Sequence, residues 1–195
     1  MGLTIFGEYH EDNLIYYTNI GVCFCNLRDY DNALVNLNKA IEIYDIICGG
    51  KFSKFDKNNN AHIIETYKYL GIVHLYFGKH HDAIECMSKS VVICNTLNGD
   101  DNVETVEILF CIGIIFKALG NIQKSLEYFK RILHILKVNS ISDNNIFTLM
   151  IHENIQNISL EPLEYFNKFF RLLEDFPITE SLSFVLVVDE IIRHI

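Results

Sequence analysis

One arrangement of small residues occurs three times along this chain and constrains its fold more than any other feature. Each copy begins with a glycine, in the order Gly21, Gly71 and Gly113. A second small residue stands 12 positions beyond each glycine, in the order Ala33, Ala83 and Ser125. A spacing that persists while the residues around it change is an internal repeat, and periods of this size are typical of stacked supersecondary units. The sequence therefore predicts a repeat protein.

The pattern of apolar residues predicts helices. In each copy the apolar residues recur with the spacing of one helix face. Each copy holds two such segments joined by a few residues, so its two helices are expected to lie antiparallel as a hairpin. Gly78 and Gly120 mark helix ends, because glycine readily takes the left-handed conformation of a C-cap. We predict an all-α protein of about nine helices, in which each repeat glycine faces the small residue 12 positions on.

The repeats also set the organisation of the chain. Residues 1–12 are interpreted as a connector that would follow the helix of an earlier repeat. The three repeats are assigned to residues 13–47, 61–95 and 102–137. The first two repeat glycines are 50 residues apart and the last two 42, so a loop insertion is placed at 48–60. Residues 138–195 are predicted to form a degenerate fourth hairpin and a C-terminal capping or interface helix, with helices near 143–157, 161–175 and 179–194.

Composition narrows the class of protein. The net charge of −9 argues against a nucleic-acid-binding protein, which would carry a basic stripe. No apolar stretch is long enough to span a membrane and no signal peptide opens the chain, so a cytoplasmic location is expected. The six cysteines include no C-x-x-C pair and fall mostly in helical segments. They are interpreted as buried small apolar residues of a reducing compartment, and not as metal ligands.

No set of residues predicts catalysis, a metal site or a cofactor. The eight histidines form neither H-x-x-x-H nor H-E-x-x-H, and the chain has no glycine-rich phosphate loop. His74 and His80 stand where the repeat has packed aromatic residues, while His81 is expected to be exposed. His152 is assigned to a solvated helix face. We therefore expect a protein that is not an enzyme.

At the repeated residues the chain resembles the tetratricopeptide repeat family. The 42-residue period and the connector Asn98–Gly99–Asp100–Asp101–Asn102 are most similar to the kinesin light chain subclass. The resemblance covers about residues 7–137 and is only suggestive over 138–195. It implies a right-handed α-solenoid of antiparallel hairpins, in which small residues let the paired helices approach closely.

The resemblance also implies a concave groove, lined by the first helix of each hairpin, that holds a partner protein. Carried over position by position, its residues in the first repeat are Ile15, Thr18, Val22, Cys25 and Asn26. The second repeat contributes Glu65, Lys68, Ile72, Leu75 and Tyr76. The third contributes Glu107, Phe110, Ile114, Lys117 and Ala118.

The groove lacks the residues of a carboxylate clamp. Family members that hold the acidic tail of a chaperone use clamp asparagines at the positions that Val22, Ile72 and Ile114 occupy here. The apolar centre of the groove instead suits an apolar or amphipathic segment of a partner protein. An alternative is that the C-terminal helices of the same chain cover several of these residues.

The leading interpretation is therefore a protein–protein interaction scaffold, and two other classes are open. The chain is also consistent with the C-terminal helical-repeat portion of a larger enzyme, such as a SET/MYND-type lysine methyltransferase. The third reading is a structural subunit that associates with itself through the ends of the solenoid. The apolar segment Ser181–Ile195 is expected to be a helix that caps the array, enters the groove or forms an interface.

Overall fold

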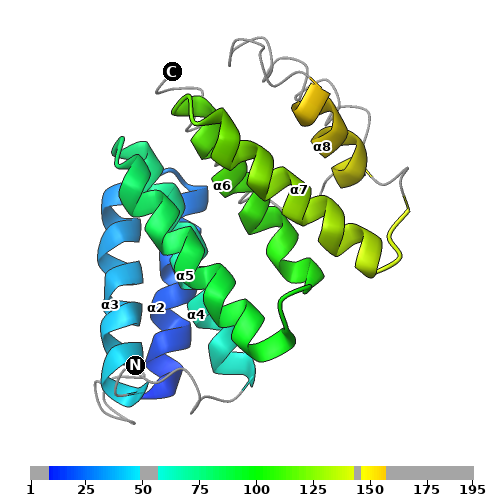
Figure 1. The fold of residues 1–195 in the computed structure, drawn as a ribbon. Helices are drawn as coiled ribbons and strands as arrows, with labels where there is room; N and C mark the ends of the chain where they lie inside the picture. Colours follow the sequence, from blue (N-terminus) through cyan, green and yellow to red (C-terminus); the bar gives the residue numbers. More distant parts are fainter. Residues whose placement is uncertain (1–8, 49–56, 143–145, 157–195) are drawn as a thin grey trace. The chain divides into compact units, whose positions relative to one another are not determined.

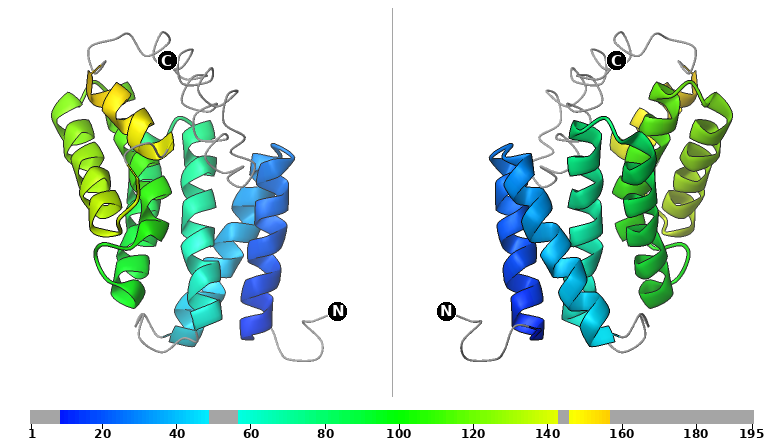
Figure 2. Two further views of the ribbon diagram at one scale, coloured as in Figure 1. Left: turned by 90° about the vertical axis from the view of Figure 1, so that its right-hand side faces the viewer. Right: turned by 90° about the vertical axis from the view of Figure 1, so that its left-hand side faces the viewer.

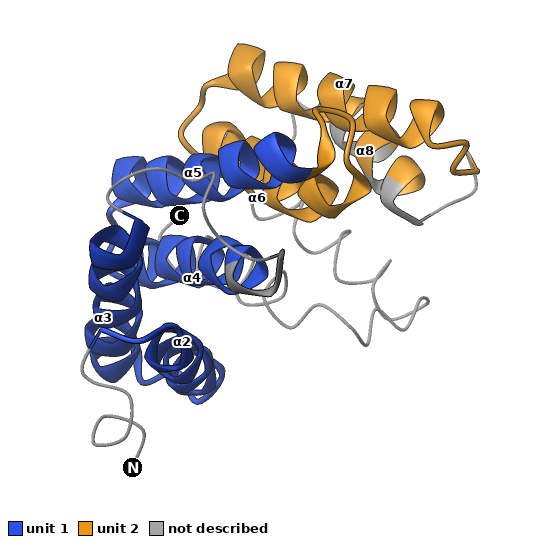
Figure 3. Ribbon diagram, turned by 90° about the horizontal axis from the view of Figure 1, so that it is seen from below, with its two compact units in different colours: residues 1–97 blue, residues 98–195 orange. Residues whose placement is uncertain are grey.

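The structure is a computed structural model that describes residues 9–48, 57–142 and 146–156. Over these ranges every regular element is a helix (Figure 1), which confirms the predicted all-α class for this part of the chain. The chain divides into two compact units, Met1–Leu97 and Asn98–Ile195, coloured separately in Figure 3. The predicted helices at 161–175 and 179–194 lie outside the described residues.

The first unit holds two helical hairpins. Its helices are α2 (Glu11–Asn26), α3 (Tyr30–Cys48), α4 (Lys57–Tyr76) and α5 (His80–Asn98). Figures 1 and 2 show α2 and α3 running side by side in opposite directions, and α4 packs against both of them. Because α4 begins at Lys57, the connection after α3 is shorter than the insertion predicted at 48–60. The stretch 49–56 lies outside the described residues.

The second unit repeats this arrangement once. A single 3₁₀ turn, η2 (Val103–Thr105), leads into α6 (Val106–Ala118), and α7 (Ile122–Val138) returns against it. The turn starts at Asn102, whose side-chain oxygen accepts a hydrogen bond from the backbone N–H of Glu104 at 3.0 Å. The next helix, α8 (Ile146–Gln156), packs against α7.

The repeat glycines bring the two helices of each hairpin together. A methyl group built on Gly21, Gly71 or Gly113 would come within 2.6, 2.7 or 2.8 Å of side-chain atoms of Leu37, Met87 and Phe129, respectively. The prediction of a close approach is confirmed, but the nearest side chains are those 16 positions on. Of the small residues 12 positions on, only Ala83 is a near neighbour, with its carbonyl oxygen 3.2 Å from a methyl group on Gly71. Residues that face each other in an antiparallel hairpin are equidistant from its turn. Gly21 and Leu37 are each eight residues from Asp29, which immediately precedes α3.

Left-handed residues end the first helix of each hairpin. Gly78 and Gly120 have φ values of 68° and 73°, as predicted for C-cap glycines. The first repeat has Arg28 at the same place, with φ 60°. In each repeat the backbone N–H of the residue after the left-handed one donates to the carbonyl five residues earlier. In the first repeat this bond joins Asp29 to Phe24 at 2.9 Å. The turn geometry is therefore kept even where the sequence lacks glycine.

The cysteines follow the prediction with one exception. All six are free thiols, and five of them are buried. Burial raises the pKa of Cys25 to about 12 and that of Cys86 to about 11. Cys23, however, is exposed on α2. The equivalent residues of the next two repeats, Val73 and Ile115, are buried. This repeat position is therefore a buried apolar one in those repeats, and it is exposed in the first hairpin.

Candidate functional site

The first helices of the first two repeats are joined by a buried pair of hydroxyl groups. The Oγ1 atoms of Thr18 on α2 and Thr66 on α4 are 2.7 Å apart, and both residues are fully buried. The Thr66 hydroxyl donates its proton to the carbonyl of His62 at 2.8 Å, so the Thr18 hydroxyl donates to Thr66. Thr18 was predicted to line the groove, and it lies inside this contact between α2 and α4.

Six of the predicted groove residues in the first unit keep exposed surface. We call them the α2/α4 surface, which consists of Ile15, Val22, Asn26, Glu65, Lys68 and Tyr76. Ile15 and Val22 lie about one turn on either side of Thr18, so they share the side of α2 that borders α4. The other predicted residues of these helices, Cys25, Ile72 and Leu75, are buried and belong to the core.

Aromatic rings hold the α4 part of this surface in place. The ring of Tyr76 lies 4.3 Å, centroid to centroid, from the buried ring of Tyr30 on α3. The ammonium of Lys68 lies 5.4 Å from the centroid of the Tyr69 ring. Glu65 and Lys68 are three positions apart on α4 and of opposite charge, so this stretch presents both an acidic and a basic group beside apolar side chains.

The third repeat presents little of its predicted site. Phe110 and Ile114 on α6 are buried, and Glu107 and Ala118 keep only part of their surface. Lys117 is only 5% exposed. Its burial lowers the pKa of the ammonium to about 8, because a low-dielectric environment disfavours the charged form. In this structure α6 therefore resembles a core helix more than a contact surface.

The histidines lie much as the repeat pattern predicts. His81 is exposed, and His74 and His80 are half-buried. Burial lowers the pKa of His74, which takes the place of Phe24 and Phe116 in the other two repeats. His152 is exposed, as expected for a solvated helix face.

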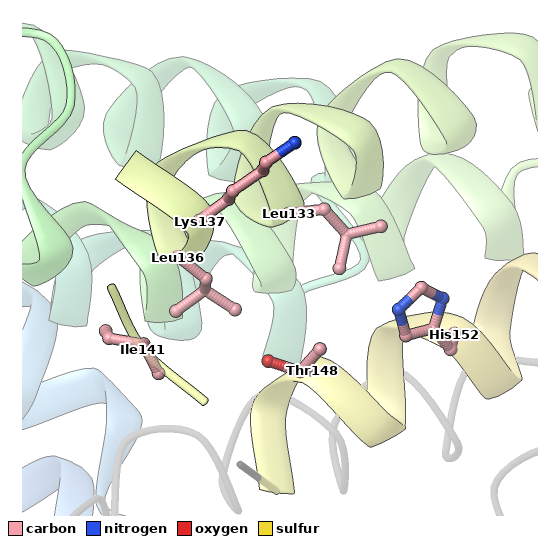
Figure 4. Close-up of a pocket in the computed structure, with 6 residues that line it drawn as sticks. All are labelled: Leu133, Leu136, Lys137, Ile141, Thr148 and His152. Atoms are coloured by element: carbon pink, nitrogen blue, oxygen red, sulfur yellow. The ribbon is translucent and has the colours of Figure 1, made fainter. Parts of the chain in front are cut away.

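A cavity between α7 and α8 was not foreseen. It has a volume of about 500 Å³ and is shown in Figure 4 with its lining residues, Leu133, Leu136, Lys137, Ile141, Thr148 and His152. The lining residues come from two helices and their connection, and they follow no regular spacing along the sequence. The sequence therefore contains no signal for this cavity. Its polar groups do not form a nucleophile and base in contact.

Two further features bear on the class of protein. Across residues 9–48, 57–142 and 146–156, no three His, Cys, Asp or Glu side chains are grouped closely enough to hold a metal ion. None of the helices in those same ranges has the length and apolar character needed to cross a membrane.

The hairpins, their close contacts at glycine and the packing of α4 on the first hairpin define a helical-repeat protein. Comparison with family models places the repeats more specifically: residues 14–45 match one model of the tetratricopeptide repeat and residues 62–137 match another. The chain therefore carries tetratricopeptide repeats, as its sequence indicates, and such repeats generally mediate protein–protein interaction. No curated protein matches the chain.

Proposed function

We propose that this chain is a non-enzymatic interaction module that holds an apolar or amphipathic segment of a partner protein along the α2/α4 surface. The observation that carries the proposal is the exposure of these six residues on two helices that Thr18 and Thr66 tie together. A surface preformed in this way loses little conformational entropy when a partner binds.

The chemistry of the surface favours an amphipathic partner. Ile15, Val22 and Tyr76 offer apolar contacts, while Glu65 and Lys68 offer one charge of each sign. A helix that lays its apolar face on such a surface can pair its flanking charges with these two groups. Val22 and Ile72, at the clamp positions, carry no amide that could bind a terminal carboxylate there.

The proposal includes two finer assignments. The 42-residue spacing between Gly71 and Gly113 supports the kinesin light chain-like subclass of the repeat. The six free cysteines support a cytoplasmic location, because thiols stay reduced in that compartment.

The test is affinity capture with a variant whose substitutions are tolerated by the fold. We choose Val22→Glu with Lys68→Glu, because both side chains are only partly buried and a charge there stays solvated. Leu75 and Ile114 are unsuitable, since glutamate at a buried position would destabilise the fold itself. The matched control is Val92→Glu with Lys130→Glu, two exposed residues that are not members of the α2/α4 surface.

The expected result is that the wild type and the control capture the same proteins from lysate, while the surface variant loses at least one of them. A synthetic peptide from that protein should then bind the wild type at least tenfold more tightly than the variant by fluorescence polarisation. Capture that is unchanged in the surface variant would show that the partner binds elsewhere.

A further inference from the structure

Three buried hydroxyl groups converge on one turn of α4. The Thr18 hydroxyl on α2 donates to the Thr66 hydroxyl at 2.7 Å, and Thr66 donates in turn to the carbonyl of His62 at 2.8 Å. The Ser90 hydroxyl on α5 donates to the carbonyl of Ile64 at 2.8 Å. The two threonines and the serine are fully buried. This turn of α4 is thus bonded both to the helix before the second hairpin and to the helix that follows it.

The repeat itself does not require hydroxyl groups at these places. Counted from the repeat glycines, none of the equivalent residues in the other two copies is a serine or a threonine. Those copies have Tyr16 and Ile108 in place of Thr66, Lys68 and Phe110 in place of Thr18, and Ala40 and Ile132 in place of Ser90. The hydroxyl groups are therefore a property of this pair of hairpins and not of the repeat.

A hydrogen bond fixes the position of a helix more closely than apolar packing does. The hydrophobic effect is not directional, so apolar contacts tolerate a small slide of one helix along another. A hydrogen bond between hydroxyl groups is lost when the oxygen atoms move apart by about 1 Å. A buried hydroxyl that loses its partner is costly. The bond between Thr18 and Thr66 therefore opposes movement of α4 along α2.

The bonded turn of α4 also carries part of the α2/α4 surface. Glu65 directly precedes Thr66, and Lys68 follows it by two positions. On α2, Ile15 stands about one turn before Thr18. The bond between the two threonines thus joins the two halves of the surface. It sets the distance between the apolar residues on α2 and the charged residues on α4.

We propose that Thr18 and Thr66 are positioning residues of the α2/α4 surface, whose hydrogen bond selects partner segments that match the spacing of its two halves. This inference rests on the function proposed above for that surface. Both side chains are fully buried, so they act through the placement of the helices and not by touching the partner. Replacing both hydroxyl groups by methyl groups removes the bond and leaves no unpaired polar atom. Their contribution is therefore to binding rather than to the stability of the fold.

The placement of α4 can be measured without a partner. Asn19→Cys on α2 and Ala61→Cys on α4 put spin labels at exposed positions, in a Cys23→Ser background that removes the exposed native thiol. Pulsed electron paramagnetic resonance should give a narrow distance distribution. Thr18→Val with Thr66→Val should shift or broaden it by about 1–2 Å, the size of a small helix displacement. An unchanged distribution would overturn the positioning role.

Peptide affinity tests the role in binding. The double valine variant should bind the partner peptide at least about tenfold more weakly than the wild type, because its surface is less well positioned. Its urea midpoint should not fall. Thr18→Ser with Thr66→Ser keeps both hydroxyl groups but loses two buried methyl groups, so it should be less stable and still bind. If the serine variant bound more weakly than the valine variant, binding would follow stability and the proposal would be wrong.

The single variants test the coupling between the two hydroxyl groups. Thr66→Val leaves the Thr18 hydroxyl buried without its acceptor, whereas Thr18→Val leaves Thr66 bonded to the carbonyl of His62. Thr66→Val should therefore lower the urea midpoint more, and adding Thr18→Val should raise it again. A midpoint that falls further in the double variant would contradict the coupling. The matched control is Thr148→Val, a buried threonine on α8, which should change neither the distance nor the peptide affinity.

These outcomes are separable from those of the proposed function. Unchanged capture by Val22→Glu with Lys68→Glu would refute the α2/α4 surface as the binding site, while the spin-label distance still decides whether Thr18 and Thr66 position α4. A distance that changes in the double valine variant while the peptide affinity does not would refute the link between positioning and binding, and the surface itself would stand.

Discussion

Replacing Gly21 by alanine tests the contact that defines the hairpin. The added methyl group would lie 2.6 Å from both Cγ and Cδ2 of Leu37, which is itself fully buried. That separation is far below van der Waals contact, and Cγ is the branch point of the side chain, so Leu37 cannot simply rotate away. Either the side chain leaves its rotamer or the two helices move apart.

Two opposing effects set the magnitude. Alanine is favoured over glycine in a helix by about 1 kcal/mol. Overpacking of a filled core costs about 1–3 kcal/mol. The net expectation for Gly21→Ala is therefore a loss of stability of up to about 2 kcal/mol. In a Leu37→Ala background the clash is absent, and the same substitution should add about 1 kcal/mol.

The measurement is urea unfolding followed by circular dichroism at 222 nm, for the two single variants and the double variant. The coupling between the sites should be about 1–3 kcal/mol, and Gly21→Ala should change sign between the two backgrounds. Asn19→Ala, at an exposed site on the same helix, reports helix propensity alone.

Gly71→Ala provides an independent comparison, because its close neighbour is Met87, whose unbranched side chain adapts more easily. Gly71→Ala should therefore cost less than Gly21→Ala. If Gly21→Ala stabilised the wild type as much as it stabilised the Leu37→Ala variant, the steric reasoning would be wrong.

Three other perturbations follow from the helix ends and the buried titratable groups. Arg28→Gly should stabilise the fold by up to about 1 kcal/mol, seen as a higher urea midpoint, since φ 60° is strained for arginine. Burial holds the pKa of His74 in the folded chain below the ordinary histidine value of about 6.5. The unfolded chain therefore binds the proton more readily, and stability should fall as the pH drops below that value. His74→Phe should flatten the dependence between pH 7.5 and 5.5, and an unchanged slope would exclude His74 as its source. Lys117→Met should stabilise the fold at pH 7, and its advantage should shrink between pH 8 and 10.5 as the wild-type lysine loses its proton in the folded state first. An advantage that is constant over that range would show that the ammonium is not the cause.

Much of the secondary structure followed from the sequence, because it depends on short-range patterns. Apolar spacing and glycine positions were sufficient to predict two helices in each of the repeats at 13–47, 61–95 and 102–137, whose outer ends match those of α2 to α7 to within a few residues. The C-caps at Gly78 and Gly120 were predicted as well. The close approach at Gly21, Gly71 and Gly113 was also predictable, since only a neighbouring helix requires a missing side chain at the same place in three repeats.

What the tertiary structure decided concerns which groups meet and which remain exposed. Leu37 faces Gly21 because of its distance from the turn, which composition does not reveal. The sequence does not show whether Thr18 lines a groove or packs between helices. The structure shows that its hydroxyl is bonded to that of Thr66. Cys23 is exposed whereas Val73 is buried, although the repeat treats the two positions alike. Burial is a property of neighbours in space, and a repeat pattern along the sequence does not specify which neighbours each copy has.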